Sequence, residues 1–545
     1  MYLGPQKQSR QLHAAQNSAI ALVTTLLAGF AIYLAYINLG HYDDFYDSGV
    51  YLESARMMIR GGHLYATIFD SQPPLWLPLV YGSMRLFGIS YLAGQLLSAT
   101  AGLIVVMTAG LIAHELSDWP GAWIAAAILI LSPMELQWSR TVSPEVPESA
   151  FAVAGMACGM RYVRSGSRGA LVMASAMIGA AVLVKLLGLF TLPALILAIG
   201  VRHLKTLRAK RSQLAARDTL LMTDILRLKE ILPEVLIDSS LVIGSFAAVI
   251  LCALLMFGPV QTWRQAVEFH WAARSAISSE AMPSAAIVVA QFFANDRLLG
   301  LALMFAIIGV VAVPEGLILG GWTGFTAAGL LYHRPLFSHH VVVLIPPIAI
   351  AAGVGWSAFW RGLLRKARYV QVRHSGIKIA TAGLAIAVGS AIAMGFSIVA
   401  VHQAVGQVRL VRQVTTYAAD MRAAQLIVQL SGPESVILTD AQGIAFIAGR
   451  DVPPQLSDTS LVRIASGYLT TAEVIRASEE SGVQLFLSWS GRLSLLPGLA
   501  EWARRRFPYH LTLGNGHELY SMRPVIGRVV SRSCGQVKKC QDPTT

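Results

Sequence analysis

Long runs of apolar side chains, separated by short polar segments, dominate the first 400 residues. Eleven such runs occur, at residues 18–39, 91–113, 122–138, 149–160, 170–184, 187–201, 236–257, 298–313, 316–332, 341–359 and 379–401. An α-helix needs about 20 apolar residues to cross the hydrocarbon core of a bilayer. The pattern therefore predicts an all-α multi-pass membrane protein with about 11 transmembrane helices. Residues 18–39 are too long for a signal-peptide core and lack a small-residue cleavage site after them, so we expect a retained anchor.

A further apolar stretch, residues 75–87, follows Pro73 and Pro74 and is too short to span a bilayer. We expect it to be re-entrant or interfacial, inside a first outer loop at residues 40–90. With this stretch left out of the count, three basic segments face the cytoplasm, as the positive-inside rule requires. They are the link with Arg161, Arg164 and Arg168, the run 202–229, which we expect to form a cytoplasmic helix, and the link 361–378. The N-terminus is then also cytoplasmic.

The composition agrees with a membrane protein and argues against nucleic-acid binding. Of 545 residues, 55% are hydrophobic and only 13% charged, and the mean hydropathy is +0.57, whereas soluble domains carry about 25% charge. The net charge of +13 comes mainly from loops between apolar runs.

Cys158 and Cys252 lie in apolar runs, and the tail cysteines Cys534 and Cys540 could form a disulfide if they lie outside the cytoplasm.

The pattern changes after residue 401. Helix-like segments at 418–430 and 470–482 alternate with strand-like segments at 435–440, 483–489 and 517–522. This alternation predicts a small extracytoplasmic α/β domain of about 120 residues, followed by a basic tail at 523–539. We expect a membrane domain at 1–401 and this second domain at 402–545. Because it lacks clustered ionisable groups, we expect it to influence acceptor choice but not the chemical step.

Ionisable side chains gather in the segments that this topology places on the outer side. They are Asp43, Asp44 and Asp47 in the first loop, then Arg140, Glu145, Glu148, Lys185, Glu268, His270, Arg274, Arg334, His339 and His340. A carboxylate can deprotonate an acceptor hydroxyl or amine, and cations can hold a phosphate leaving group. The set suits transfer of a group from a lipid phosphate, unless the residues merely pair with one another. His339 and His340 could bind a metal, but adjacent side chains on a helix diverge, so we expect these two residues to pack or form hydrogen bonds. We therefore predict no metal site and no cofactor from these residues. Whether the reaction needs a divalent metal stays open.

The first loop resembles that of the GT-C glycosyltransferases that use polyprenyl-phosphate sugars, the protein O-mannosyltransferases and the lipid A aminoarabinose transferases. The spacing of Asp47, Tyr51, Glu53, Arg56, Met58 and Gly62 carries the resemblance, and Glu145, Lys185, His270 and Arg274 extend it. It covers about residues 18–400 and, more weakly, the C-terminal domain. The family's Asp-Glu pair is Asp47-Ser48 here, so Asp44 is a candidate for the second carboxylate. Where the family has a Lys before a Pro, this sequence has Gln72. Lys185, Arg274 and Arg334 therefore become more important as candidates for contacting the donor phosphate.

The resemblance implies a membrane glycosyltransferase that moves a hexose or pentose from a polyprenyl-phosphate carrier, with inversion. The acceptor, a glycan, lipid or protein, would lie at the outer face of the plasma (inner) membrane. The implied catalytic residues are Asp47, Asp44 and Glu145. The implied substrate-binding residues are Tyr51, Arg56, Gln72, Arg140, Lys185, His270, Arg274, Arg334 and His339. Besides donor and acceptor, the expected partners are membrane lipids and no nucleic acid.

Two other functions remain open at this stage. A transporter or lipid flippase should show charged or broken sites near mid-helix and paired halves, and neither is evident. An inactive GT-C homologue that acts in assembly is compatible with Ser48 and Gln72 at the two departures from the family pattern.

Overall fold

The computed structural model describes residues 5–214, 222–276, 283–372 and 376–524. Its contacts divide the chain into two compact units, Met1–His41 with Ser71–Thr415, and Tyr42–Asp70 with Thr416–Thr545. The sequence suggested a boundary at 401/402 with the first outer loop in the membrane domain. The contacts differ because the last long helix runs on to Arg412 and residues 42–70 pack with the C-terminal region.

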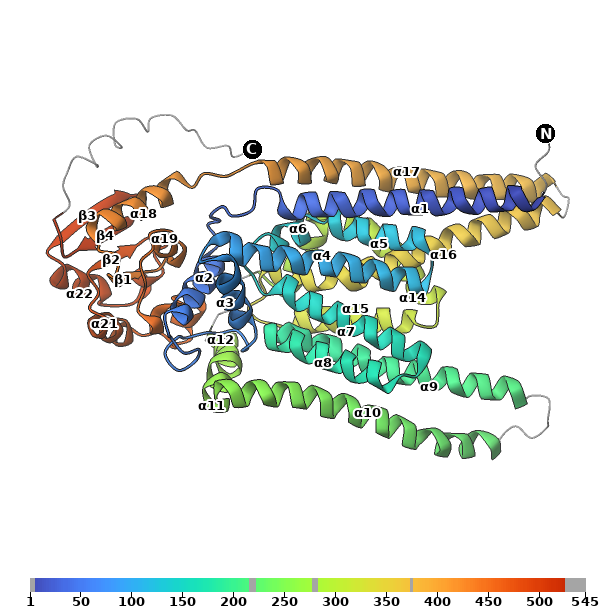
Figure 1. The fold of residues 1–545 in the computed structure, drawn as a ribbon, viewed down its shortest axis with the longest axis horizontal. Coiled ribbons are helices and arrows are strands. Elements are labelled where there is room, and N and C mark those ends of the chain that lie inside the picture. The colour runs from blue at the N-terminus through green and yellow to red at the C-terminus, as the bar shows by residue number, and fades with distance from the viewer. Residues whose placement is uncertain (1–4, 215–221, 277–282, 373–375, 525–545) are drawn as a thin grey trace. The chain divides into compact units, whose positions relative to one another are not determined.

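The first unit is a bundle of long helices that run side by side (Figure 1). Its helices are α1 (Pro5–Tyr36), α3 (Trp76–Phe87), α4 (Tyr91–Leu116), α5 (Trp119–Leu131), α6 (Pro133–Ser139), α7 (Glu145–Ser165), α8 (Arg168–Val184), η1 (Leu186–Thr191), α9 (Leu192–Leu214), α10 (Met222–Phe257), α11 (Pro259–Trp263), η2 (Arg264–Glu268), α12 (Phe269–Ala276), α13 (Ala285–Asn295), α14 (Arg297–Ala312), α15 (Gly316–Tyr332), η3 (Ser338–Leu344), α16 (Ile345–Val372) and α17 (Gly376–Arg412). Each predicted apolar run coincides with one of these helices or a neighbouring pair.

Six helices in the described part of the chain are long and apolar enough to cross a membrane, or up to eight if each of two bent pairs forms one span. The bent pairs are α5–α6, which turns by 67°, and α13–α14, which turns by 101°, while α8 and α15 are shorter apolar helices. The protein is therefore a multi-pass, mostly helical membrane protein.

Three local expectations from the sequence are corrected. The run 122–138 is not one helix, because Ser132 caps a new helix that begins at Pro133. The basic run 202–229 is not a separate helix, since α9 and α10 both extend into it, with residues 215–221 outside the described residues. The eleven predicted apolar runs do not include α13, an apolar helix that Ser284 caps.

Small residues let the membrane helices approach closely. A Cβ atom on Gly309 of α14 would lie 1.9 Å from the Ala351 carbonyl oxygen of α16, and one on Gly355 would lie 1.8 Å from that of Phe305. Such close backbone contact through glycine is characteristic of helix packing in membranes.

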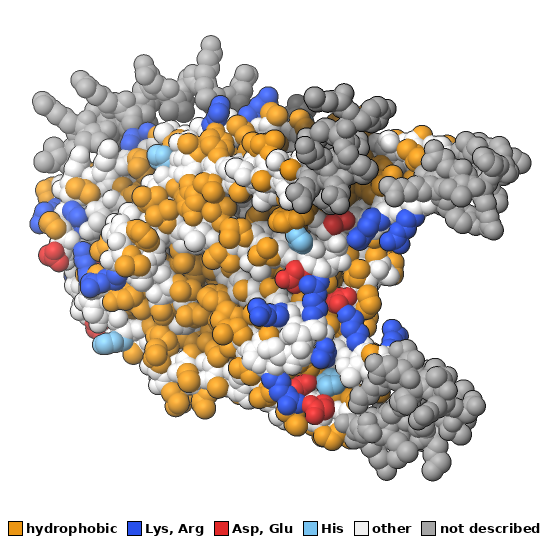
Figure 2. Space-filling view, turned by 45° about the vertical axis from the view of Figure 1, so that its right-hand side comes forward, with side chains coloured by type: hydrophobic (Ala, Val, Ile, Leu, Met, Phe, Trp, Pro, Cys, Tyr) orange, Lys and Arg blue, Asp and Glu red, His pale blue; other side chains and the backbone are white. Residues whose placement is uncertain are grey.

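Charged side chains pair at one end of this bundle. Arg164 contacts Glu115 at 3.0 Å, Arg168 contacts Glu234, and Lys205 contacts Glu315. In the view of Figure 2, Lys, Arg, Asp and Glu side chains gather in one region beside a broad hydrophobic surface. This separation suits helices whose sides face lipid and whose ends face water.

The second unit contains a four-stranded sheet of order β1-β2-β4-β3. Its elements are α2 (Tyr46–Ile59), α18 (Ala418–Leu430), β1 (Ile437–Thr439), α19 (Gln442–Ile447), η4 (Pro454–Leu456), α20 (Leu461–Ala465), α21 (Thr471–Glu480), β2 (Leu485–Ser488), η5 (Leu493–Leu495), α22 (Leu499–Arg506), β3 (Tyr509–Gly514) and β4 (His517–Ser521). β1 and β2 are parallel, with Ile437 opposite Leu485, and β4 is antiparallel to β2 and β3. The expected small α/β fold is present, while β3 and the short helices around it were not predicted.

Candidate active site

A buried ion pair lies at a helix break in the first unit. Lys185 follows α8 in an extended conformation, with φ −153° and ψ 137°, so the helix stops there and η1 begins. Its ammonium contacts the carboxylate of Glu145, the first residue of α7. Lys185 is 8% exposed and Glu145 is 1% exposed. The structure thus joins two outer segments that the sequence singled out separately.

Two histidines border the same carboxylate. Nε2 of His339 lies 3.6 Å from Oε1 of Glu145. The His339 ring packs on the rings of Trp138, at 4.9 Å, and His340, at 4.4 Å. The histidine rings pack, as predicted. In addition, one possible metal-ligand atom from each of Glu145, His339 and His340 lies within 4.8 Å of the other two, which is close enough to hold a divalent metal. Lys185 already supplies a cation to that carboxylate, so the arrangement satisfies the charge of Glu145 without a metal.

A second cation lies against an aromatic ring. The guanidinium of Arg274, on α12, lies 3.8 Å from the ring centroid of Tyr332, the last residue of α15. Such stacking orients an exposed cation without neutralising its charge. His270 lies one turn earlier on α12 beside Phe269, at 5.4 Å, and Arg334 is exposed two residues after Tyr332. Tyr332 was missed from sequence because an aromatic residue at the end of an apolar helix is typical of membrane interfaces.

Arg140 lies at the end of α1. Its guanidinium donates hydrogen bonds to four carbonyl oxygens at the end of α1, those of Leu34 (2.6 Å), Ala35 (3.0 Å), Ile37 (2.7 Å) and Asn38 (3.3 Å). The last carbonyls of a helix lack partners within the helix. Arg140 therefore caps α1, which favours a structural role over the predicted contact with the donor.

Gln72 lies in the half-buried link before α3. Its amide donates a long hydrogen bond of 3.5 Å to the Ser71 hydroxyl. A neutral amide at this place supplies no charge to a phosphate, so the candidate cations for binding the donor phosphate are Lys185, Arg274 and Arg334.

The first-loop carboxylates belong to the second unit. Asp47 lies in the first turn of α2, where the helix dipole favours the ionised form. Asp43 accepts a hydrogen bond of 3.2 Å from the Ser48 hydroxyl. Burial, together with the charge of Asp44 and a hydrogen bond to it, raises the pKa of Tyr417 to about 12. Asp43 and Asp44 are thus engaged at the start of α2, and Tyr51, one turn after Asp47, is 5% exposed.

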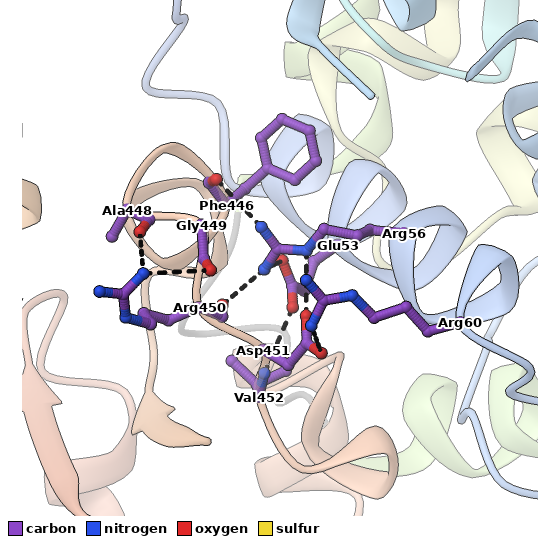
Figure 3. Close-up of polar contacts among 9 residues, drawn as sticks. All are labelled: Glu53, Arg56, Arg60, Phe446, Ala448, Gly449, Arg450, Asp451 and Val452. Atoms are coloured by element: carbon purple, nitrogen blue, oxygen red, sulfur yellow. Dashed lines mark hydrogen bonds and ion pairs between the residues drawn. The ribbon is translucent and has the colours of Figure 1, made fainter. Parts of the chain in front are cut away.

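Arg56 lies in a buried network (Figure 3). It is 3% exposed. Its guanidinium donates to Glu53 at 2.5 Å, to the carbonyl oxygens of Arg450 at 2.5 Å and Phe446 at 3.1 Å, and its Nε lies 3.1 Å from Asp451. The sequence predicted a contact between Arg56 and the donor. In the structure, the guanidinium binds groups of the C-terminal region. Those partners lie about 390 residues along the chain, with no local signal that links them.

The comparisons with known proteins agree with this architecture. The family described as dolichyl-phosphate-mannose-protein mannosyltransferase matches residues 52–229. The crystal structure of ArnT from Cupriavidus metallidurans bound to undecaprenyl phosphate has a TM-score of 0.57 at 15% identity, and the similarity covers 92% of this chain and 98% of ArnT. The apo state of ArnT gives 0.57 at 16% identity, over 93% and 98%.

A second solved structure shares the fold more distantly. The oligosaccharyltransferase AglB from Archaeoglobus fulgidus, in complex with an inhibitory peptide and a dolichol-phosphate, has a TM-score of 0.50 at 14% identity, covering 93% of this chain and 74% of AglB. No curated protein sequence matches the chain. Over residues 52–229 the chain is therefore similar to the dolichyl-phosphate-mannose-protein mannosyltransferases, and its fold is the GT-C type fold of ArnT.

Proposed function

We propose that this protein is a glycosyltransferase, which takes a sugar from a polyprenyl-phosphate carrier and transfers it to an acceptor at the extracytoplasmic face of the membrane. ArnT is solved with undecaprenyl phosphate and AglB with a dolichol-phosphate. The observation that carries the proposal is the buried Lys185–Glu145 pair at a helix break. Ionisable groups are costly inside a membrane protein and usually mark a functional site.

In the proposed reaction, Asp47 takes a proton from the acceptor hydroxyl or amine. The acceptor atom bonds to the anomeric carbon as the bond from that carbon to the phosphate oxygen breaks. The phosphate leaves on its prenyl chain with one more negative charge, which Lys185 and Arg274 stabilise. One displacement inverts the anomeric centre. Tyr51, His270, Arg334 and His339 are proposed to contact the substrates, and Asp44 and Glu145 to support Asp47 and Lys185.

We place the protein in the plasma membrane with 11 spans, a cytoplasmic N-terminus and an extracytoplasmic C-terminal region. The basic link between α7 and α8 and the ion pairs near it support a cytoplasmic position for that end. The count includes α8, of 17 residues, whose length of about 26 Å nearly matches the hydrocarbon core of about 30 Å.

Native mass spectrometry and a transfer assay on the same nanodisc preparation test this function. We expect co-purified polyprenyl phosphate, and release of free polyprenyl phosphate in step with glycosylated acceptor when a panel of polyprenyl-phosphate sugars is supplied. Movement of the intact donor across the bilayer without release of its sugar would favour a flippase. Donor binding without transfer to any glycan, lipid or peptide acceptor would favour an inactive homologue.

A further inference from the structure

Helix α2, which carries Asp47, is packed tightly against the C-terminal region. Ten of its 14 residues are buried. A Cβ atom on Gly49 would lie 2.2 Å from the backbone nitrogen of Gly443, at the start of α19. The two helix backbones therefore touch, and α2 cannot shift toward α19 without displacing it.

Tyr46 holds the first turn of α2. Its hydroxyl donates to Asp458 at 3.0 Å and accepts from the backbone N–H of Thr459 at 2.6 Å. The guanidinium of Arg492 lies 3.9 Å from the ring centroid. The residue next to Asp47 is thus fixed by contacts to two separate segments of the C-terminal region.

Arg56 holds the same helix three turns later. The carbonyls of Phe446 and Arg450 that it binds lie at the end of α19 and in the turn after it, so the guanidinium caps that helix. Glu53, which is fully buried, accepts from the backbone N–H of Val452 at 3.2 Å. α2 is therefore tied to one turn, residues 446–452, through both members of an i,i+3 ion pair.

Ion pairs link α2 to this turn. Two cations, Arg56 and Arg60, face two carboxylates, Glu53 and Asp451. Arg56 and Glu53 lie inside, whereas the Arg60 side chain is 42% exposed. A buried guanidinium that binds two carbonyls and two carboxylates holds its helix far more firmly than an exposed pair does.

We propose that Arg56 is a positioning residue: with Tyr46, it fixes the Asp47 carboxylate by holding α2 against residues 446–459. This inference rests on the proposed function, in which Asp47 activates the acceptor. A displacement of about 1 Å in a reacting group can cost about 100-fold in rate. The C-terminal region is then required for the chemical step, contrary to the expectation that it affects only acceptor choice.

The test compares variants that separate position from folding. Arg56→Met alone leaves Glu53 buried without its partner and should lower the Tm of the protein. Glu53→Leu with Arg56→Met replaces the pair by apolar side chains and should recover much of that Tm, yet kcat for transfer should stay at least about 10-fold below wild type. The KM for the donor should not change. Arg60→Met, which removes the exposed contact to Asp451, is the matched control and should keep wild-type kcat.

Two further variants decide the matter if the double variant does not fold. Tyr46→Phe removes only the hydroxyl contacts at the other anchor and should lower kcat at unchanged donor KM, and Arg56→Lys should restore part of the kcat lost in Arg56→Met. The proposal is overturned if Tyr46→Phe and the folded double variant both keep wild-type kcat. It is also overturned if Arg56 variants raise the donor KM and leave kcat unchanged, because Arg56 would then bind the donor. If the wild-type protein transfers no sugar, the proposed glycosyltransferase function is wrong. That result is distinct from a failure of the inference on Arg56.

Discussion

Lys185 and Glu145 form a buried contact between the end of α8 and the start of α7, 40 residues apart in the sequence. Neither side chain could be buried alone at this place without a large cost in free energy. The pair keeps an ammonium group in the protein interior, where we expect it to bind the phosphate of the proposed donor.

We expect Lys185→Ala to weaken binding of polyprenyl phosphate by about 10- to 100-fold, because a charge-assisted hydrogen bond contributes about 1.5–3 kcal/mol. Binding is measured by titrating the lipid into protein in nanodiscs. Glu145→Gln in the Lys185→Ala background controls for the carboxylate left unpaired. Unchanged affinity in both variants would show that Lys185 does not hold the phosphate.

Asp47→Asn should reduce transfer by about 100- to 10,000-fold, the usual contribution of a general base. The amide cannot accept the acceptor proton, but it keeps the size of the side chain, so donor binding should persist or tighten as a negative charge is lost. Transfer and donor binding are measured on the same preparation. Glu434→Gln, which neutralises an exposed carboxylate of the same unit, is the matched control. Wild-type rates in Asp47→Asn would make Asp44 or Glu145 the next candidate for the catalytic carboxylate.

Cysteine labelling tests the proposed topology. In a background without the four native cysteines, Glu480→Cys should react with a membrane-impermeant maleimide in intact cells. Ser165→Cys, at the last residue of α7, should react only after the membrane is made permeable. Both positions are exposed in the structure. Labelling of both from the same side contradicts the 11-span arrangement.

Stability should depend on pH through Glu53. Burial raises its pKa from 4.5 to about 7, with Arg56 opposing that shift. The folded protein therefore holds this proton more tightly than the unfolded chain does, so the contribution of Glu53 to stability is complete below pH 4.5 and is lost as the pH rises through about 7. Thermal unfolding from pH 4.5 to 8 should show Glu53→Gln losing less stability than wild type over this interval. Parallel curves for the two proteins would contradict the shift.

Gly49→Ala tests the contact between α2 and α19. The added methyl group would overlap the Gly443 backbone, so we expect a destabilisation of at least about 1–3 kcal/mol, as for other overpacked sites. Gly82→Ala, in α3, meets no atom within 4 Å and should be neutral or slightly stabilising. A Tm for Gly49→Ala equal to that of Gly82→Ala would mean that the helices can separate freely.

Sequence alone predicted the helical bundle because apolar runs are local signals. The helix starts after Ser132 and Ser284 were not predicted, although both serines are capping residues that can be recognised once the structure is known. It also singled out Glu145, Lys185 and His339, since charged residues beside apolar runs are conspicuous. It could not predict the partners of Arg56 or Arg140. Both guanidinium groups bind backbone carbonyls, which every residue carries, so no side-chain pattern marks the far end of the contact.

The distance along the chain between Arg56 and Phe446, 390 residues, has a consequence for biosynthesis. Because a chain is made from its N-terminus, Arg56 emerges long before the carbonyls that bind it. The loop with Asp47 therefore stays incompletely packed until the membrane helices have been inserted and the last part of the chain has been made. Full-length synthesis thus becomes a condition for activity, and a prematurely terminated chain that inserts normally should remain inert.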